Sequence, residues 1–171
     1  VKEISRLAFS LMKDAGLDVS HFENDETLSA MMEKGLNCPR SSGMGRLFDG
    51  VAAICGMKPL SSYEGQGAVL LEAAAEESDK LYPISLEGDI MRFDWREMIC
   101  AICADLEKGL PVSLIASGFM NTLIQMALEQ CRAARTATGI NDVVLSGGSF
   151  QNMYIMNRLP KTLEADGFKV W

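Results

Sequence analysis

The feature that most constrains the fold is one long periodic segment, residues 111–138, which lies between a proline and a glycine. Pro111 suits the first position of a helix, and Gly139 suits its end. Within the segment, positions on a single helical face are occupied by Val112, Ile115, Phe119, Thr122 and Met126. The spacing therefore predicts one long helix that packs inward along this face.

Composition narrows the class of protein. A chain of 171 residues is expected to form one domain or two small lobes. The net charge of −7 and the lack of a dense Lys/Arg stretch argue against a nucleic-acid partner. No apolar run approaches the roughly 20 residues that span a bilayer, and the start, VKEISRLAFS, is not a signal peptide. We expect a cytoplasmic protein without a membrane partner.

The cysteines do not indicate a metal site. An odd number, five, in a chain without an export signal suggests reduced thiols. Cys100 and Cys103 form a C-x-x-C pattern inside a helical segment, where they are expected to be buried apolar thiols. A structural zinc site would need a second pair of ligands. The single histidine, His21, lies in a polar loop and is expected to be solvated.

The patterns in the rest of the sequence predict a helix-rich α/β fold with two parts, residues 1–140 and 141–171. Helices are expected over 3–15, 26–34, 46–55, 65–78 and 95–108, with two short strands around Gly88 in 82–94. Residues 1–140 thus form a mainly helical subdomain, with Thr27 able to cap its second helix. Residues 141–171 read as a β-α-β unit in which Pro160 kinks or restarts the helix. Its last strand, 168–171, is apolar and unprotected, which predicts self-association through that strand.

The segment SSGMGRLFDGVAAICG, residues 41–56, allows two interpretations. It is a largely buried helix whose exceptions, Arg46 and Asp49, lie three residues apart on one side. They form either a simple intrahelical ion pair or part of a helix start that opens on a ligand. Gly43 and Gly45 would allow a ligand to approach closely in the second case. The spacing alone leaves both open.

Two further segments contain glycines where a helix begins. SYEGQGAVLLEAAA places Glu64 just before a helix, where an acidic side chain is favoured by the helix dipole. VVLSGGSFQN is a strand, a Gly-Gly turn and a helix start, and a plain connection would need only one glycine. Such turns let backbone N–H groups approach a phosphate, a ribose or a base.

These three segments, in this order, resemble the C-terminal transferase domain of the HypF carbamoyltransferases, a branch of the larger TsaD group of tRNA threonylcarbamoyladenosine transferases. The resemblance covers residues 35–171 and is looser before them. It implies an actin/Hsp70-like (ASKHA) nucleotide-binding fold. It also implies that ATP and carbamoyl phosphate form carbamoyl-adenylate, from which the carbamoyl group passes to the C-terminal cysteine of the acceptor HypE. That group becomes a cyanide ligand of [NiFe] hydrogenase.

The resemblance also implies a set of site residues. The nucleotide-binding residues would be Arg46, Asp49, Gly65, Gly147, Gly148 and Asn152. Asp49 matches the aspartate that contacts the ribose, Asn152 the asparagine that touches the base or substrate, and the glycines line the ligand. Arg46 would contact a phosphate or support a residue that does. No catalytic residue in this chain is implied.

The departures from the family pattern matter equally. The family's iron or zinc ion is held by two histidines and an aspartate in segments that this chain does not contain, and Met120 stands where a histidine is common. We therefore expect the chain alone to be catalytically inactive. It is either a fragment of a HypF-type enzyme or a degenerate, non-catalytic nucleotide-binding or assembly module. A tRNA-modifying role is the third alternative.

Overall fold

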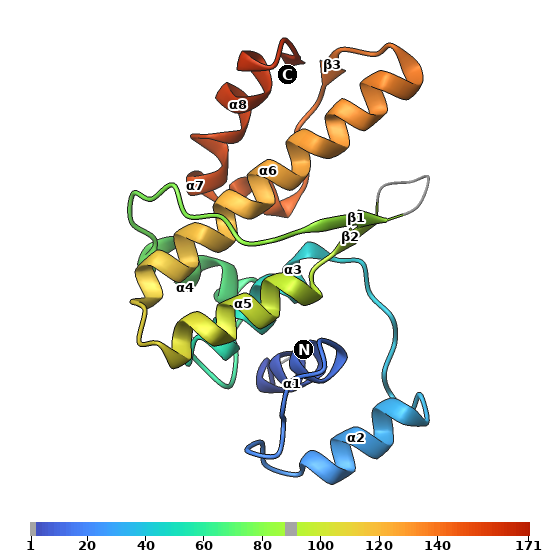
Figure 1. Ribbon diagram of the computed structural model, residues 1–171, viewed down its shortest axis with the longest axis vertical. Helices are drawn as coiled ribbons and strands as arrows, with labels where there is room; N and C mark the ends of the chain where they lie inside the picture. Colours follow the sequence, from blue (N-terminus) through green and yellow to red (C-terminus); the bar gives the residue numbers. More distant parts are fainter. Residues whose placement is uncertain (1–2, 88–91) are drawn as a thin grey trace.

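One helix of 27 residues, α6 (Val112–Thr138), runs across the molecule and organises the other elements (Figure 1). The computed structural model describes residues 3–87 and 92–171. Pro111 occupies the N-cap position, one residue before the place expected from the sequence, and Gly139 ends the helix with a φ of 73°. Its middle, Ile115 to Met120, is buried on every side. The predicted long helix is confirmed, and it is the centre of the core.

The helix α6 also meets the length and apolar composition of a membrane span, but this observation is weak. Of the apolar window that qualifies, 61% is buried inside the protein. Burial of this kind is also found in helices at the core of a domain. It is the one such helix among residues 3–87 and 92–171.

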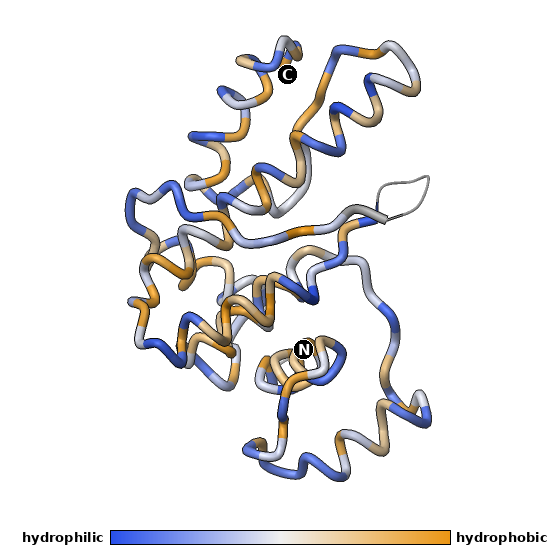
Figure 2. The backbone as a smooth tube through the Cα atoms, viewed as in Figure 1, coloured by the Kyte–Doolittle hydropathy of each residue, from blue (hydrophilic) through white to orange (hydrophobic). Residues whose placement is uncertain are grey.

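Four shorter helices form a layer beside α6. Their bounds are α1 (Ser5–Asp14), α3 (Met44–Ile54), α4 (Gln66–Ala74) and α5 (Arg96–Glu107). In this layer α3, α4 and α5 contact α6, and α1 packs on α3 and α5. The helix α3 packs between α1 and α4, and the rings of Phe48 and Phe119 join α3 to α6 edge to face at 5.0 Å. The apolar stretches gather where α3, α4, α5 and α6 meet (Figure 2). This layer of helices holds the segments 41–56 and 62–75, which contain α3 and α4.

Two of these boundaries differ from the sequence prediction for physical reasons. The helix α4 ends at Ala74, four residues early, because the following chain is held along α6 by side-chain hydrogen bonds. Ser117 and Thr122 of α6 accept from the backbone N–H groups of Glu76 and Tyr82 at 2.9 and 2.8 Å. The predicted cap by Thr27 is wrong: α2 (Asp25–Glu33) begins after Asn24, in the left-handed region.

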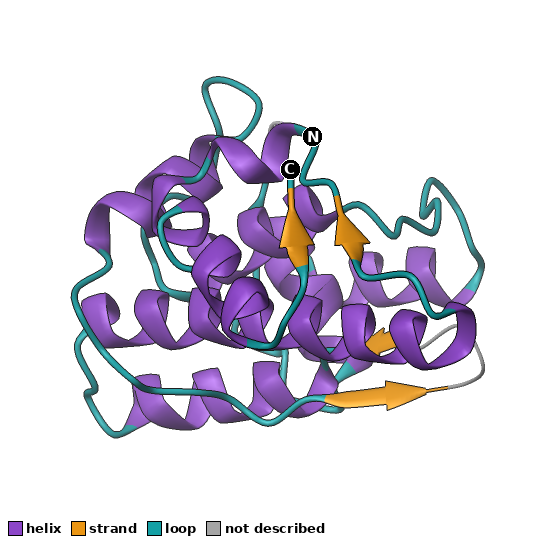
Figure 3. Ribbon diagram, turned by 90° about the horizontal axis from the view of Figure 1, so that it is seen from above, coloured by secondary structure: helices purple, strands orange, loops and turns teal. Residues whose placement is uncertain are grey.

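The strands form two small sheets. The pair β1 (Ser85–Glu87) and β2 (Arg92–Asp94) is antiparallel, as expected for 82–94, whereas Gly88 lies outside the described residues. The strands β3 (Asp142–Val143) and β4 (Lys169–Val170) lie side by side and point the same way (Figure 3). The β-α-β unit that the sequence predicts is therefore present, with both strands shorter than expected.

The connection between β3 and β4 is broken into three short pieces. They are the 3₁₀ turn η1 (Gly148–Gln151) and the helices α7 (Met153–Met156) and α8 (Leu159–Ala165). Pro160 lies in the first turn of α8, where its missing N–H costs no hydrogen bond, so the predicted restart is confirmed. The unit packs on α6 through buried Leu159 and Leu163. One continuous core, from Leu47 to Phe168, thus draws on both parts that the sequence predicts.

Candidate functional site

The buried carboxylate of Asp49 is the central feature of the candidate site. Asp49 lies in the second turn of α3 and is only 2% exposed. Its Oδ2 is 3.1 Å from Nη2 of Arg46, so the two side chains form an intrahelical ion pair, which is compatible with both interpretations of this segment. Arg46 is partly exposed, and it connects the buried acid to the surface. The ion pair satisfies one of the two carboxylate oxygens.

The second oxygen, Oδ1, has no hydrogen bond of normal geometry from any described residue. Burial raises the pKa of Asp49, the guanidinium of Arg46 and the nearby N–H of Gly67 lower it, and the first effect prevails. A buried polar atom left without a partner costs about 1–3 kcal/mol. A buried carboxylate with a raised pKa is a candidate for a binding or catalytic site.

The start of α4 lies directly against Asp49. Gly65 has a φ of 82° and forms the N-cap of the helix, a backbone conformation that favours glycine. A Cβ added to Gly67 would lie 2.7 Å from Oδ1 of Asp49, so only glycine permits this approach. The charge of the exposed Glu64 also raises the pKa of Asp49. The structure thus brings together the segments 41–56 and 62–75, which both contain glycines at a helix start.

The Gly-Gly turn is connected to the same helix at its other end. Gly147 adopts φ 103° and ψ 170°, and neither Gly147 nor Gly148 has an atom within 4 Å of an added Cβ. Both glycines are exposed. Just beyond them, the N–H of Met153 donates to Oε1 of Glu72 in the last turn of α4 at 2.9 Å. Through α4, all three segments therefore belong to one packed unit.

Asn152 has a structural role that the sequence reasoning did not identify. It is 6% exposed, its Oδ1 accepts from the N–H of Ile155 at 3.0 Å, and its Nδ2 contacts Sδ of Met120 at 3.5 Å. Asn152 is therefore the N-cap of α7. Its position directly before a helix was the available signal, because asparagine is among the best N-cap residues.

The thiols and acids offer no metal centre. Burial raises the pKa of Cys55 to about 12 and that of Cys103 to about 11, so both are inert apolar thiols at neutral pH. Cys103 is buried in α5, as the sequence predicts, and Cys100 is half-buried there. His21 is exposed, also as predicted. Across residues 3–87 and 92–171, no three His, Cys, Asp or Glu side chains gather to hold an ion.

Comparison with known proteins identifies the family. The model of the Carbamoyltransferase, Kae1-like Domain, second subdomain, matches residues 1–171. The Carbamoyltransferase HypF of Synechocystis is 34% identical over 149 residues, and that of Rhizobium leguminosarum is 32% identical over 143 residues. Each match covers more than four fifths of this chain (85% and 83%) but 18% of the relative.

Solved structures give the same result. A full-length HypF, whose crystal structure is described as the phosphate- and nucleotide-bound form, superposes with a TM-score of 0.92 at 34% identity. That match covers 99% of this chain and 28% of the other. The HypF of T. kodakarensis gives a TM-score of 0.72 at 26% identity, covering 97% and 21%. The expected helix-rich part of an ASKHA-type fold is confirmed, and the chain belongs to the Kae1-like family of HypF carbamoyltransferases, as its second subdomain.

Proposed function

We propose that this chain forms one wall of the nucleotide site at which a HypF-type enzyme completes carbamoyl transfer. ATP and carbamoyl phosphate would yield carbamoyl-adenylate, and the carbamoyl group would pass to the C-terminal cysteine of a HypE-like acceptor. The reaction would serve [NiFe] hydrogenase maturation in the cytoplasm. The family supports the carbamoyltransferase class, and the acceptor and adenylate chemistry belong to the proposal.

The observation that carries the proposal is the buried Oδ1 of Asp49, which receives no hydrogen bond of normal geometry although the N–H of Gly67 lies nearby. A ribose presents two adjacent hydroxyl donors, and this oxygen would accept one of them when the start of α4, which covers it here, moves aside. Arg46 pairs with the same carboxylate, and its side chain is partly exposed at the surface, where it could contact a phosphate. Gly65, Gly147 and Gly148 add backbone without side chains, which suits close approach of a nucleotide.

The iron or zinc ion expected from the resemblance does not fit the residues present. The described parts of the chain offer no group of three or more ligating side chains. Polarisation of the carbamoyl carbonyl by a metal would need ligands from outside this chain. The residues here can bind and orient the nucleotide, and they exclude water from one side of it. We therefore propose that the chain alone is inactive in transfer.

The alternative, a non-catalytic binding module, draws support from Met120 and Asn152. Met120 is fully buried and touches the amide of Asn152. Both the oxygen and the nitrogen of that amide have partners inside the protein. Asn152 could therefore hydrogen-bond a base only if it lost its bond to the first turn of α7. In this alternative the nucleotide contact through Asp49 persists, but transfer is lost even in the natural protein.

The test separates adenylate formation from transfer in the natural protein that carries this chain. Asp49→Asn keeps the shape of the side chain but removes the charged acceptor. We expect carbamoyl-phosphate-dependent ATP–pyrophosphate exchange at the wild-type rate, and carbamoylation of the acceptor cysteine lowered at least tenfold (about 1.5–3 kcal/mol for a charged hydrogen bond). Mass spectrometry of the acceptor measures the second step.

Asp14→Asn is the matched control, because Asp14 is an exposed aspartate at the end of α1. It should change neither reaction. Unchanged transfer by Asp49→Asn would refute the proposed role of Asp49. A wild-type protein that performs exchange but no transfer would favour the non-catalytic module.

A further inference from the structure

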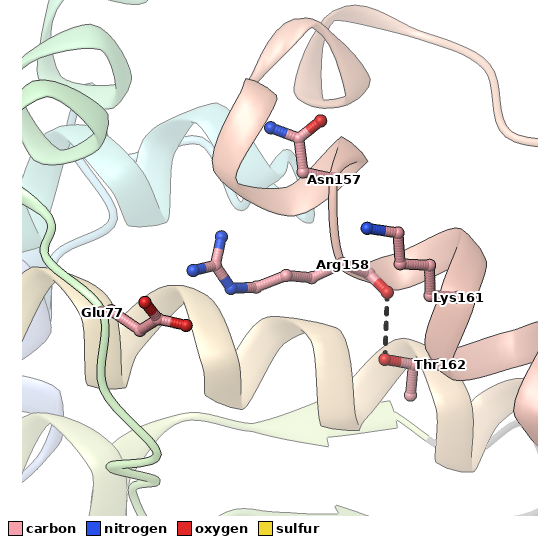
Figure 4. A pocket seen from close by; sticks show the side chains of 5 residues that line it. All are labelled: Glu77, Asn157, Arg158, Lys161 and Thr162. Carbon is pink, nitrogen blue, oxygen red and sulfur yellow. Dashed lines mark hydrogen bonds between the residues drawn. The ribbon is translucent and has the colours of Figure 1, made fainter.

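A second candidate site lies where α7 meets α8, on elements other than those that hold Asp49. A pocket of about 400 Å³, open to solvent, is found there (Figure 4). Its lining residues are Glu77, Asn157, Arg158, Lys161 and Thr162. An adjacent depression shares Arg158 and Thr162 and continues along α6 past Asn121 and Gln125. Arg158 thus stands between two hollows of one surface.

The guanidinium of Arg158 is held in place without an anion. Its Cζ lies 3.8 Å from the centroid of the Tyr154 ring, and its Nη1 donates to the backbone oxygen of Tyr154 at 3.4 Å. Tyr154 itself is only 8% exposed, and its hydroxyl bonds Oδ1 of Asn121 at 3.0 Å. A stacked guanidinium keeps its remaining N–H groups directed outward, which lowers the entropy cost of binding a ligand.

The cations of this pocket form no ion pair with any described carboxylate. Five arginines form ion pairs with carboxylates: Arg6, Arg46, Arg96, Arg132 and Arg135. Among the described residues Arg158 forms none, and neither does Lys161, which extends along the same pocket (Figure 4). What distinguishes Arg158 and Lys161 is that both line one pocket.

Glu77 narrows the class of ligand. Its carboxylate faces the Arg158 guanidinium across the pocket (Figure 4), yet no ion pair joins them. A ligand between the two walls must offer an anion to one side and a hydrogen-bond donor to the other. We infer that this pocket binds a small phosphate- or carboxylate-bearing metabolite that also carries a hydroxyl or amino group. Arg158 and Lys161 take the anionic group, and Glu77 takes the donor.

The experiment is an NMR titration of the protein at constant ionic strength, with the Arg158 side-chain N–H and the Lys161 amide as reporters. The probes are two pairs, inorganic phosphate with glycerol 3-phosphate and acetate with lactate, and chloride is the reference. Glycerol 3-phosphate or lactate should bind several-fold more tightly than phosphate or acetate respectively, because their hydroxyl reaches Glu77. The preferred member of the two pairs distinguishes a phosphate from a carboxylate ligand.

Substitutions in the pocket should change the binding affinity in opposite directions. Arg158→Ala should weaken binding of the preferred probe about tenfold or more, and Arg158→Lys, which keeps the charge but not the planar fork, should weaken it as well. Glu77→Gln should strengthen binding of inorganic phosphate about two- to fivefold, because it removes a like charge. Lys34→Ala removes an exposed lysine of the α2 end and should change nothing.

Three results would overturn the inference. They are shifts no larger than those with chloride, affinities unchanged in both Arg158 variants, or weaker phosphate binding in Glu77→Gln. If Arg158→Ala fails to fold, the Arg158→Lys and Glu77→Gln results decide. Asp49→Asn should leave this binding intact, so failure here is distinct from failure of the proposed nucleotide site.

Discussion

The approach of α4 to α3 at Gly67 can be tested with a single methyl group. In Gly67→Ala the new Cβ would lie 2.7 Å from Oδ1 and 2.8 Å from Cα of Asp49, and 3.3 Å from Cβ of Ala52. The Cα of Asp49 belongs to helical backbone and cannot rotate away. The two helices must therefore separate, or the Asp49 side chain and its backbone must shift.

The expected change in the free energy of unfolding follows from two opposing terms. Alanine in place of glycine inside a helix stabilises by about 0.8–1 kcal/mol. Overpacking of a buried contact costs about 1–3 kcal/mol, and this contact is shorter than the closest that real Cβ atoms make. We therefore expect Gly67→Ala to destabilise by about 1–2 kcal/mol and to weaken nucleotide binding, since Asp49 is displaced.

Gly45→Ala is the matched control. Gly45 lies in the first turn of α3, its φ is not positive, and an added Cβ meets nothing within 4 Å. This variant should stabilise by up to about 1 kcal/mol through helix propensity alone. Urea denaturation measures both variants. If Gly67→Ala were as stable as Gly45→Ala, the close packing at Asp49 and the reasoning built on it would be refuted.

Four further predictions concern other contacts. Burial raises the pKa of Asp49 above its ordinary value of 3.8, so wild-type stability has a contribution at low pH that is lost as pH rises through the raised pKa; urea titrations should therefore show Asp49→Asn gaining stability relative to wild type as pH rises above 3.8. Asn152→Ala should cost about 1–2 kcal/mol in the same assay, because α7 loses its cap. Hydrogen bonds from Arg132 lead the effects that lower the pKa of Asp166, so stability should fall as acid titrates that group, and Asp166→Asn should abolish this part of the pH dependence. Trp171 is 64% exposed beside β4, so sedimentation should show concentration-dependent self-association that Trp171→Ser reduces, and a monomer at all concentrations would contradict it.

Much of the fold could be predicted from the spacing of apolar residues and from the prolines and glycines that begin or end helices. The helix of 112–138 was predictable because apolar spacing, a proline and a glycine agree on its limits. The restart at Pro160 was predictable because proline cannot donate the hydrogen bond of a helix interior. The early end of α4 was not, since the competing bonds come from Ser117 and Thr122, some forty residues further along the chain.

The site shows the same division between local and distant information. The spacing of Arg46 and Asp49 predicts their ion pair, because residues three apart meet on a helix. The free second oxygen of Asp49 depends on how α4 packs, which no local pattern contains. The last aromatic pair is also instructive: Phe168 is buried beneath Arg135, whose Cζ lies 4.1 Å from the ring centroid, while Trp171 is exposed. The last strand, expected to be unprotected, is thus exposed at Trp171 and covered at Phe168, because packing distinguishes two residues that the sequence pattern does not.

The central claim is that the buried carboxylate of Asp49 receives the ribose of a nucleotide. A crystal structure of the natural protein with a bound adenosine nucleotide tests it most directly. We expect a ribose hydroxyl within hydrogen-bond distance of Asp49 Oδ1, with Gly65, Gly147 and Gly148 lining the ligand. A nucleotide bound to this subdomain whose ribose makes no hydrogen bond to Asp49 would contradict this role of Asp49.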